Sequence, residues 1–270
     1  MARLDPWPLA AFAGLLDVPA PPLRTGDPLP PLWQWFFFLD PTAQSALGQD
    51  GHPREGRFLP PFPDRRRMIA GGRLTGHRPL PIGADVVRRS SLASSTVKHG
   101  RTGEMAFVTV RHEFLVDGEA LAVEEQDVVY RQQKPGRNRP MPAPTTDGRD
   151  AAAPSAPWSV TIDPDPALLF RFSALTYNAH RIHYDEAYTR TVEGYPGLVT
   201  HGPLLALLLL ELPRRHAPDA TVDSVDFRLT RPAFAGQRIV AQGTPDGPEI
   251  AASAGVPGAD ASISAAIRLR

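Results

Sequence analysis

The chain has 270 residues, and its 29 Lys and Arg are balanced by 29 Asp and Glu, so its formal net charge is zero. This balance excludes a general basic field for nucleic-acid binding. The hydrophobic content of 42% is sufficient for a folded core, and the absence of cysteine excludes disulfides and thiolate metal sites.

Neither a secretory signal nor a membrane helix is expected. Residues 1–7 lack a basic stretch followed by a continuous apolar segment. The longest leucine-rich run, residues 204–212, is much shorter than the ~20 residues that a membrane helix needs. We therefore expect a cytoplasmic protein with no membrane partner.

The first half of the chain predicts a buried apolar segment followed by strands. Residues 32–39 form a dense apolar run that ends at Asp40-Pro41. Residues 73–79 predict a strand, and residues 81–83 predict a turn. Apolar and polar residues alternate with the period of a strand over 108–113. Asp117-Gly118 then predicts a hairpin turn, and residues 121–130 predict the return strand.

A segment rich in proline and alanine divides the chain. Residues 132–157 contain several proline and glycine breakers and little apolar periodicity. We interpret this segment as a linker between an N-terminal half, 1–131, and a C-terminal half, 158–270. No simple sequence repeat is visible, but both halves place helical or irregular segments before strands.

The second half predicts helices and then strands. Residues 173–188 lack internal proline and glycine, which favours a largely helical segment. Residues 204–212 are apolar all round, which predicts a buried helix with Pro213 at its end or in its last turn. Strands are expected around 225–229, 239–242 and 262–269. A buried helix followed by antiparallel strands indicates an α+β fold in which a sheet wraps around the helix.

Proton-handling residues interrupt the apolar sequence of this half. Asn178, His180 and His183 lie close together, and His201-Gly202 opens the apolar helix. A glycine at a helix start offers a backbone N–H with little obstruction, and histidines exchange protons near neutral pH. These residues predict a site that polarises a carbonyl and handles a proton.

Residues 172–185 and 197–204 resemble the MaoC-like hydratases of the hot-dog fold. The resemblance is to the two-domain branch that contains hydroxyacyl-thioester dehydratase type 2 and the mesaconyl-C4-CoA and itaconyl-CoA hydratases. Residues 67–72 and 100–103 resemble the N-terminal half of this branch less specifically. The resemblance implies a double hot-dog with antiparallel sheets, each wrapped around a central helix. It also implies a catalytic second half and a first half that shapes the acyl pocket without its own machinery.

The hydratase motif of this family is commonly Asp-x-Asn-Pro-x-His. Aligned on the preceding Phe-x-x-Leu, these positions fall on Asn178, His180, Arg181 and His183, and only the histidine is retained. Gly202 falls where the family places its thioester-binding backbone amide. A carboxamide cannot act as a general base. Either His183 carries the proton alone while Asn178 orients water, or the activity differs from that of the family.

The resemblance implies reversible hydration or dehydration of an α,β-unsaturated or 3-hydroxyacyl thioester. The expected substrate is a short or branched dicarboxylic enoyl-CoA such as mesaconyl-C4-CoA or itaconyl-CoA. The alternatives are a 3-hydroxyacyl chain on an acyl carrier protein, a thioesterase, and a catalytically silent acyl-thioester-binding protein. Catalysis is assigned to His183, Asn178 and Gly202, while His180, His201 and Tyr177 are expected to bind substrate or support the catalytic groups.

No cofactor or metal is expected beyond the coenzyme A or carrier protein attached to the substrate. His180, His183 and Asp185 could be interpreted as a metal site, but no third strong ligand follows at zinc-like spacing. Arg228 and Arg231, or the cluster at residues 65–67, would suit a coenzyme A phosphate or could be solvated surface charge. A homodimer is plausible, although no specific residue indicates one.

Overall fold

The computed structural model describes residues 1–18, 23–60, 65–76, 78–100, 103–132, 140–151, 154 and 156–270. The described strands form one antiparallel 10-stranded sheet with the order β1-β3-β4-β5-β2-β7-β10-β9-β8-β6. The two ends of this order mirror each other, because each half contributes five strands in the same arrangement. Strands β2 and β7 join the halves through five registered residue pairs, from Gly71↔Arg228 to Thr75↔Ser224.

The first half begins with strand β1 and helix α1 and continues with two 3₁₀ turns before its long strands. The bounds are β1 Ala2–Arg3, α1 Trp7–Leu15, η1 Trp33–Phe36, η2 Gln44–Ala46, β2 Arg65–Gly76, β3 Asp85–Gly100, β4 Gly103–Val116 and β5 Glu119–Gln132. The expected hairpin turn between β4 and β5 is confirmed, since Asp117 and Gly118 have φ values of 49° and 85°. The expected burial of the 32–39 run is confirmed at Trp33 and Phe36.

The second half places several short helical segments between its first strand and the rest of its sheet. The bounds are β6 Trp158–Ile162, α2 Pro166–Leu175, η3 Arg181–His183, α3 Glu186–Tyr188, a π-helical turn η4 Thr189–Glu193, α4 Gly202–His216, β7 Val222–Leu229, β8 Ile239–Asp246, β9 Glu249–Gly255 and β10 Ile263–Leu269. The Asp165 carboxylate accepts a hydrogen bond from the Leu168 N–H and caps α2, whose first residue is Pro166.

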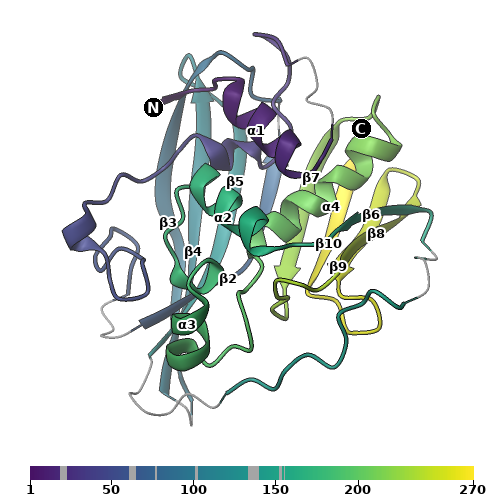
Figure 1. The fold of residues 1–270 in the computed structure, drawn as a ribbon. Helices are drawn as coiled ribbons and strands as arrows, with labels where there is room; N and C mark the ends of the chain where they lie inside the picture. The colour runs from purple at the N-terminus through teal and green to yellow at the C-terminus, as the bar shows by residue number, and fades with distance from the viewer. Residues whose placement is uncertain are drawn as a thin grey trace.

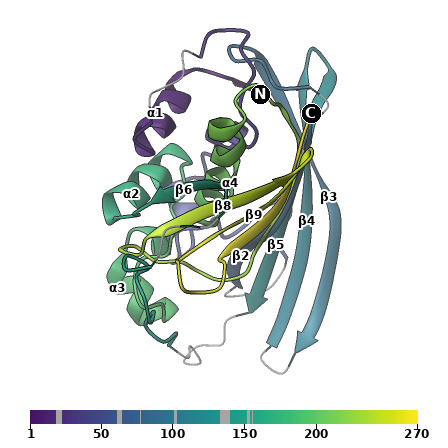
Figure 2. The same cartoon turned by 90° about the vertical axis from the view of Figure 1, so that its right-hand side faces the viewer.

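The helices lie on one face of the sheet. Figure 1 shows α4 crossing in front of the second-half strands, and the turned view in Figure 2 places α1, α2 and α4 on the same side of the curved sheet. Residues 204–212 of α4 are all buried, which confirms the predicted core helix, and Pro213 lies in its last turn. One hydrophobic cluster includes Phe12, Trp33, Leu207 and Phe227. The halves therefore share a core, and the α+β expectation is confirmed.

Four strands were not expected from the sequence: β1, β3, β6 and β9. Strand β3 contains Arg88, Arg89 and several serines, and most of its side chains are exposed, so it lacks an apolar alternation. The linker prediction lies partly outside the described residues. Residues 140–151 contain no helix or strand and run from the first half toward β6 (Figure 1). They are held to the second half, because the Arg238 N–H donates to the Asp147 carbonyl at 2.7 Å.

No helix among the described residues is long and apolar enough to cross a membrane.

Candidate active site

A cavity of about 900 Å³ lies between the two halves of the chain. The second half contributes five of the predicted site residues to its lining: Tyr177, Asn178, His180, His183 and Gly202. The first half lines it with residues from the 47–53 loop and from β2. The sequence motif and the first half therefore meet at one cavity.

The segment that carries the motif is not the long helix expected over 173–188, and that prediction was wrong. Helix α2 ends at Leu175, and Tyr177 adopts a left-handed backbone with φ 51°. The Asn178 side-chain oxygen accepts a hydrogen bond from the His180 N–H at 3.0 Å. Such local side-chain bonds compete with helical hydrogen bonds and favour a turn. The turn exposes Tyr177 and carries His180 and His183 to the cavity.

His183 is held in one tautomer. Its Nδ1 lies 2.7 Å from the Val199 carbonyl oxygen, which can only accept, so Nδ1 carries the proton and Nε2 keeps a lone pair. The Val199 N–H in turn donates to the Ile182 carbonyl at 2.9 Å, which fixes the two segments together. Burial lowers the pKa of His183 to about 4, so the ring is neutral near pH 7. The geometry provides a buried neutral imidazole that can accept a proton.

The His201 ring packs against the His183 ring. The two rings stack with centroids 3.6 Å apart and an angle of 18° between their planes. His201 Nε2 is hydrogen-bonded to the Ser173 hydroxyl at 2.8 Å, and burial holds the pKa of His201 well below its usual range. His201 is fully buried and does not line the cavity.

Gly202 begins helix α4 at the cavity wall. Its N–H belongs to the first turn of the helix, where backbone donors have no intrahelical partner and the helix dipole favours negative charge. Gly202 does not have positive φ, so backbone strain does not explain the residue. A Cβ at this position would lie 2.6 Å from Leu229 Cδ1, the far end of a side chain, so Leu229 would have to move to accept a larger residue.

The first half contributes Asp50 and His52, which were not identified from the sequence. His52 Nδ1 donates to the Asp50 carboxylate at 2.9 Å, and the His52 ring lies 4.1 Å from the His180 ring. Gly51, between them, has φ 89°, and a Cβ there would lie only 1.8 Å from the Ala179 carbonyl oxygen. An Asp-Gly-His triplet in a loop is a weak sequence signal for a functional site. Its role depends on contacts with residues more than a hundred positions away.

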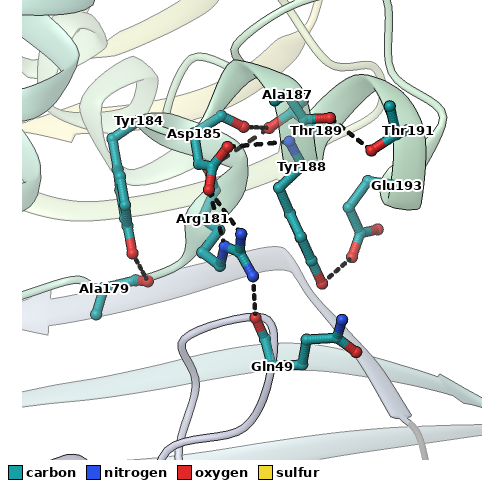
Figure 3. Close-up of polar contacts among 10 residues, drawn as sticks. All are labelled: Gln49, Ala179, Arg181, Tyr184, Asp185, Ala187, Tyr188, Thr189, Thr191 and Glu193. Atoms are coloured by element: carbon teal, nitrogen blue, oxygen red, sulfur yellow. Dashed lines mark hydrogen bonds and ion pairs between the residues drawn. The ribbon is translucent and has the colours of Figure 1, made fainter.

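Asp185 stabilises the motif segment and is not among the residues that line the cavity. Figure 3 shows its carboxylate between the Arg181 guanidinium and the Tyr188 N–H. Arg181 also donates to the Gln49 carbonyl at 3.1 Å and lies 3.9 Å from the centre of the Tyr188 ring. Among the described residues, the ligand atoms of His180, His183 and Asp185 do not come together as a metal site.

A different set could hold a metal ion by geometry alone. Ligand atoms of Asp50, His52 and His180 all lie within 4.8 Å of one another. However, burial lowers the pKa of His180 well below its usual range, and the charges of Arg66 and Arg67 lower it further. Two positive charges that act on the same ring also oppose a metal cation there.

The arginines singled out from the sequence have different environments. Arg231 lines the cavity and forms an ion pair with Asp260, whereas Arg228 is exposed and does not line it. Arg66 and Arg67 both line the cavity, while the side chain of Arg65 lies outside the described residues.

The comparisons with known proteins agree with the resemblance seen in the sequence. The family described as hydroxyacyl-thioester dehydratase type 2 matches residues 32–235. The mesaconyl-C(4)-CoA hydratase of Chloroflexus aurantiacus is 45% identical over 263 residues, which cover 96% of this chain and 90% of that protein.

Solved structures support the fold. HtdX of Mycobacterium tuberculosis has a TM-score of 0.67 at 16% identity, and the match covers 98% of this chain and 96% of HtdX. A conserved Mycobacterium tuberculosis protein with a double hot-dog fold has a TM-score of 0.55 at 13% identity, covering 99% of this chain and 92% of that protein. The expected double hot-dog is therefore confirmed.

Proposed function

The chain belongs to the hydroxyacyl-thioester dehydratase type 2 family, and we propose that it hydrates a short dicarboxylic enoyl-CoA of the mesaconyl-C4 type. It is a hydro-lyase that adds water to, or removes it from, an acyl thioester. The choice of substrate is supported by the 45% identity to a mesaconyl-C(4)-CoA hydratase over nearly the whole chain. The observation that carries the chemistry is the neutral His183, fixed by Val199, beside the start of α4.

His183 is the proposed acid–base group. As water adds to the β-carbon, Nε2 accepts the water proton and the ring becomes an imidazolium. The same nitrogen then returns a proton to the α-carbon, so one imidazole serves both transfers. In the dehydration direction, His183 removes the α-proton and protonates the departing hydroxyl. Stacking on His201 and the hydrogen bond to Val199 keep the ring in place during both steps.

The Gly202 N–H is the proposed oxyanion donor. Negative charge develops on the thioester oxygen when water attacks, and a backbone donor at a buried helix start stabilises that charge. Pro203 carries no N–H that would compete for the oxygen. The leucines of α4 anchor this donor in the core, so it needs little reorganisation during the reaction.

Asn178 is proposed to orient the attacking water. Its side-chain oxygen is occupied by the His180 N–H, which leaves the amide NH₂ as the group available to the cavity. An NH₂ donates and does not accept a proton, so the base role falls to His183. No cofactor or metal takes part in this scheme.

The test is a panel of enoyl thioesters with the loss of the conjugated thioester absorbance as the readout. Mesaconyl-C4-CoA, crotonyl-CoA and a long enoyl chain on an acyl carrier protein should be compared by this readout at equal concentration, and itaconyl-CoA, whose double bond is not conjugated with the thioester, by separation of the product. We expect the dicarboxylic CoA esters to have the highest kcat/KM. A clear preference for the carrier-protein substrate would replace the proposed substrate class, and binding without turnover of any thioester would contradict the enzyme assignment.

A further inference from the structure

Two adjacent arginines of β2 both line the cavity but differ in their partners. Arg66 forms an ion pair with the Glu193 carboxylate and donates to the Glu193 carbonyl at 2.8 Å. Its guanidinium also lies 5.8 Å from the centre of the Tyr195 ring. Through these contacts Arg66 holds η4 against the first half of the chain.

Arg67 has none of these contacts. Its side chain is half-buried and lines the cavity, and its guanidinium forms no hydrogen bond or ion pair with any residue that the structure describes. Burial lowers the pKa of His52 and His180, and the charge of Arg67 lowers the pKa of both further. Arg67 therefore lies near both histidines, and among the described residues no carboxylate forms an ion pair with it.

A guanidinium in this setting is suited to an anion. Arginine presents a planar set of donors that matches a carboxylate with two parallel hydrogen bonds. The partly desolvated cation would gain more from such a pair than an exposed cation would. The neutral histidines around it do not compete for the anion.

We propose that Arg67 binds the free carboxylate at the far end of a dicarboxylic acyl chain and so selects the substrate; this rests on the function proposed above. A mesaconyl-C4 thioester carries that carboxylate only a few bonds from the thioester carbonyl. The centres of the His180 and His183 rings are 5.4 Å apart, and Arg67 lines the same cavity as both histidines and Gly202. The first half thereby supplies the selectivity, and the second half supplies the proton transfer.

The coenzyme A phosphates are another source of negative charge. They lie far along the pantetheine chain from the thioester, whereas Arg67 acts on histidines at the reacting end of the cavity. A substrate that has the phosphates but no acyl carboxylate distinguishes these two possible anions. Crotonyl-CoA is such a substrate.

The experiment compares the kinetics of Arg67→Gln, Arg67→Lys and the wild-type enzyme on mesaconyl-C4-CoA and crotonyl-CoA, with thermal melts to confirm folding. Arg228→Gln is the control, because Arg228 is exposed on β7, the strand that pairs with β2, and does not line the cavity. Loss of a charge-assisted pair should raise the KM of Arg67→Gln for mesaconyl-C4-CoA by about 10- to 100-fold. Its KM for crotonyl-CoA should change by less than about threefold, and Arg67→Lys should be intermediate on the dicarboxylic substrate.

Each contrary outcome has a distinct meaning. Equal losses on both substrates would assign Arg67 to the coenzyme A phosphates and overturn the proposal. Unchanged kinetics on mesaconyl-C4-CoA, with a wild-type enzyme that prefers it, would overturn the role of Arg67 and leave the proposed function standing. A wild-type enzyme that hydrates crotonyl-CoA but not the dicarboxylic substrate would reject the proposed substrate class and the role of Arg67 with it.

Discussion

Replacing His183 with asparagine should separate its proton chemistry from its structural role. The asparagine amide can still donate to the Val199 carbonyl, but it cannot accept a proton. We expect His183→Asn to lower kcat by at least ~100-fold, the usual scale for a lost general acid–base group. The variant should remain folded near neutral pH, because the hydrogen bond that holds this segment is retained.

The same substitution should change the acid stability of the protein. The pKa of His183 falls from 6.5 to about 4 on folding because the ring is buried. Between these values the unfolded chain binds a proton that the folded chain does not, so the free energy of unfolding falls as the pH falls. From pH 7 to pH 5 this difference lowers the free energy of unfolding by about 2 kcal/mol. His183→Asn should lack that contribution.

Urea unfolding at the two pH values measures this effect, and the hydration assay measures the loss of catalysis. His112→Asn is the matched control. His112 is also buried, with a pKa lowered to about 4 mainly by burial, but it bonds Ser90 in the first half and does not line the cavity. It should show the same gain in acid resistance with normal turnover. A folded His183→Asn enzyme with near wild-type turnover would refute the acid–base assignment, and unchanged acid sensitivity would refute the buried neutral imidazole.

Four further predictions concern the rest of the site. Asn178→Ala should lower kcat by about tenfold or more with little change in substrate affinity, since it removes a water-orienting donor; steady-state kinetics would contradict this role if both Asn178→Ala and Asn178→Asp match the wild type. Gly51→Ala should displace the 47–53 loop and greatly reduce turnover, because its Cβ would overlap the Ala179 carbonyl oxygen. Gly118→Ala is the control, because Gly118 has a similar φ of 85° but no atom lies within 4 Å of its Cβ. It should lower the free energy of unfolding by only about 1 kcal/mol in a thermal melt and stay active. Equal effects of the two variants would show that backbone strain alone is measured. Gly202→Val should abolish turnover with a modest loss of stability, whereas Leu207→Ala, at a fully buried position, should destabilise by about 2–5 kcal/mol and stay active in the folded fraction; an active Gly202→Val enzyme would place the thioester carbonyl elsewhere. Dialysis against a strong chelator should leave the rate unchanged, because the positive charges beside the histidines oppose a metal ion, and a rate that is lost and then restored by zinc would contradict this expectation.

The sequence was most informative where one local pattern determines the structure. The all-apolar run of α4 can only be stable when buried, and the alternation around Val225–Leu229 fits a strand with one face in the core. The short distance between His180 and His183 along the chain also ensured that they would be neighbours. These features were predicted correctly from residues within a few positions of each other.

The sequence was least informative where the local structure depends on contacts between residues far apart in the chain. The helix predicted over 173–188 is interrupted at Tyr177 and Asn178, because a side-chain hydrogen bond within the turn replaces the helical ones. Asp50 and His52 become part of the site only because Gly51 packs on Ala179. Arg67 differs from Arg66 through the position of Glu193, which the order of residues in β2 does not reveal.

The outer end of the sheet at β3 has a consequence for association between copies of the chain. Strand β1 covers only residues Asp85 and Val86, so among the described residues most of the β3 edge has no backbone partner. Open edges can pair with strands of another molecule. Here the register shifts between Leu92 and Ser94, and positive side chains occur at Arg88, Arg89 and Lys98. Irregularity and like charge both oppose the addition of a second copy at this edge of the sheet.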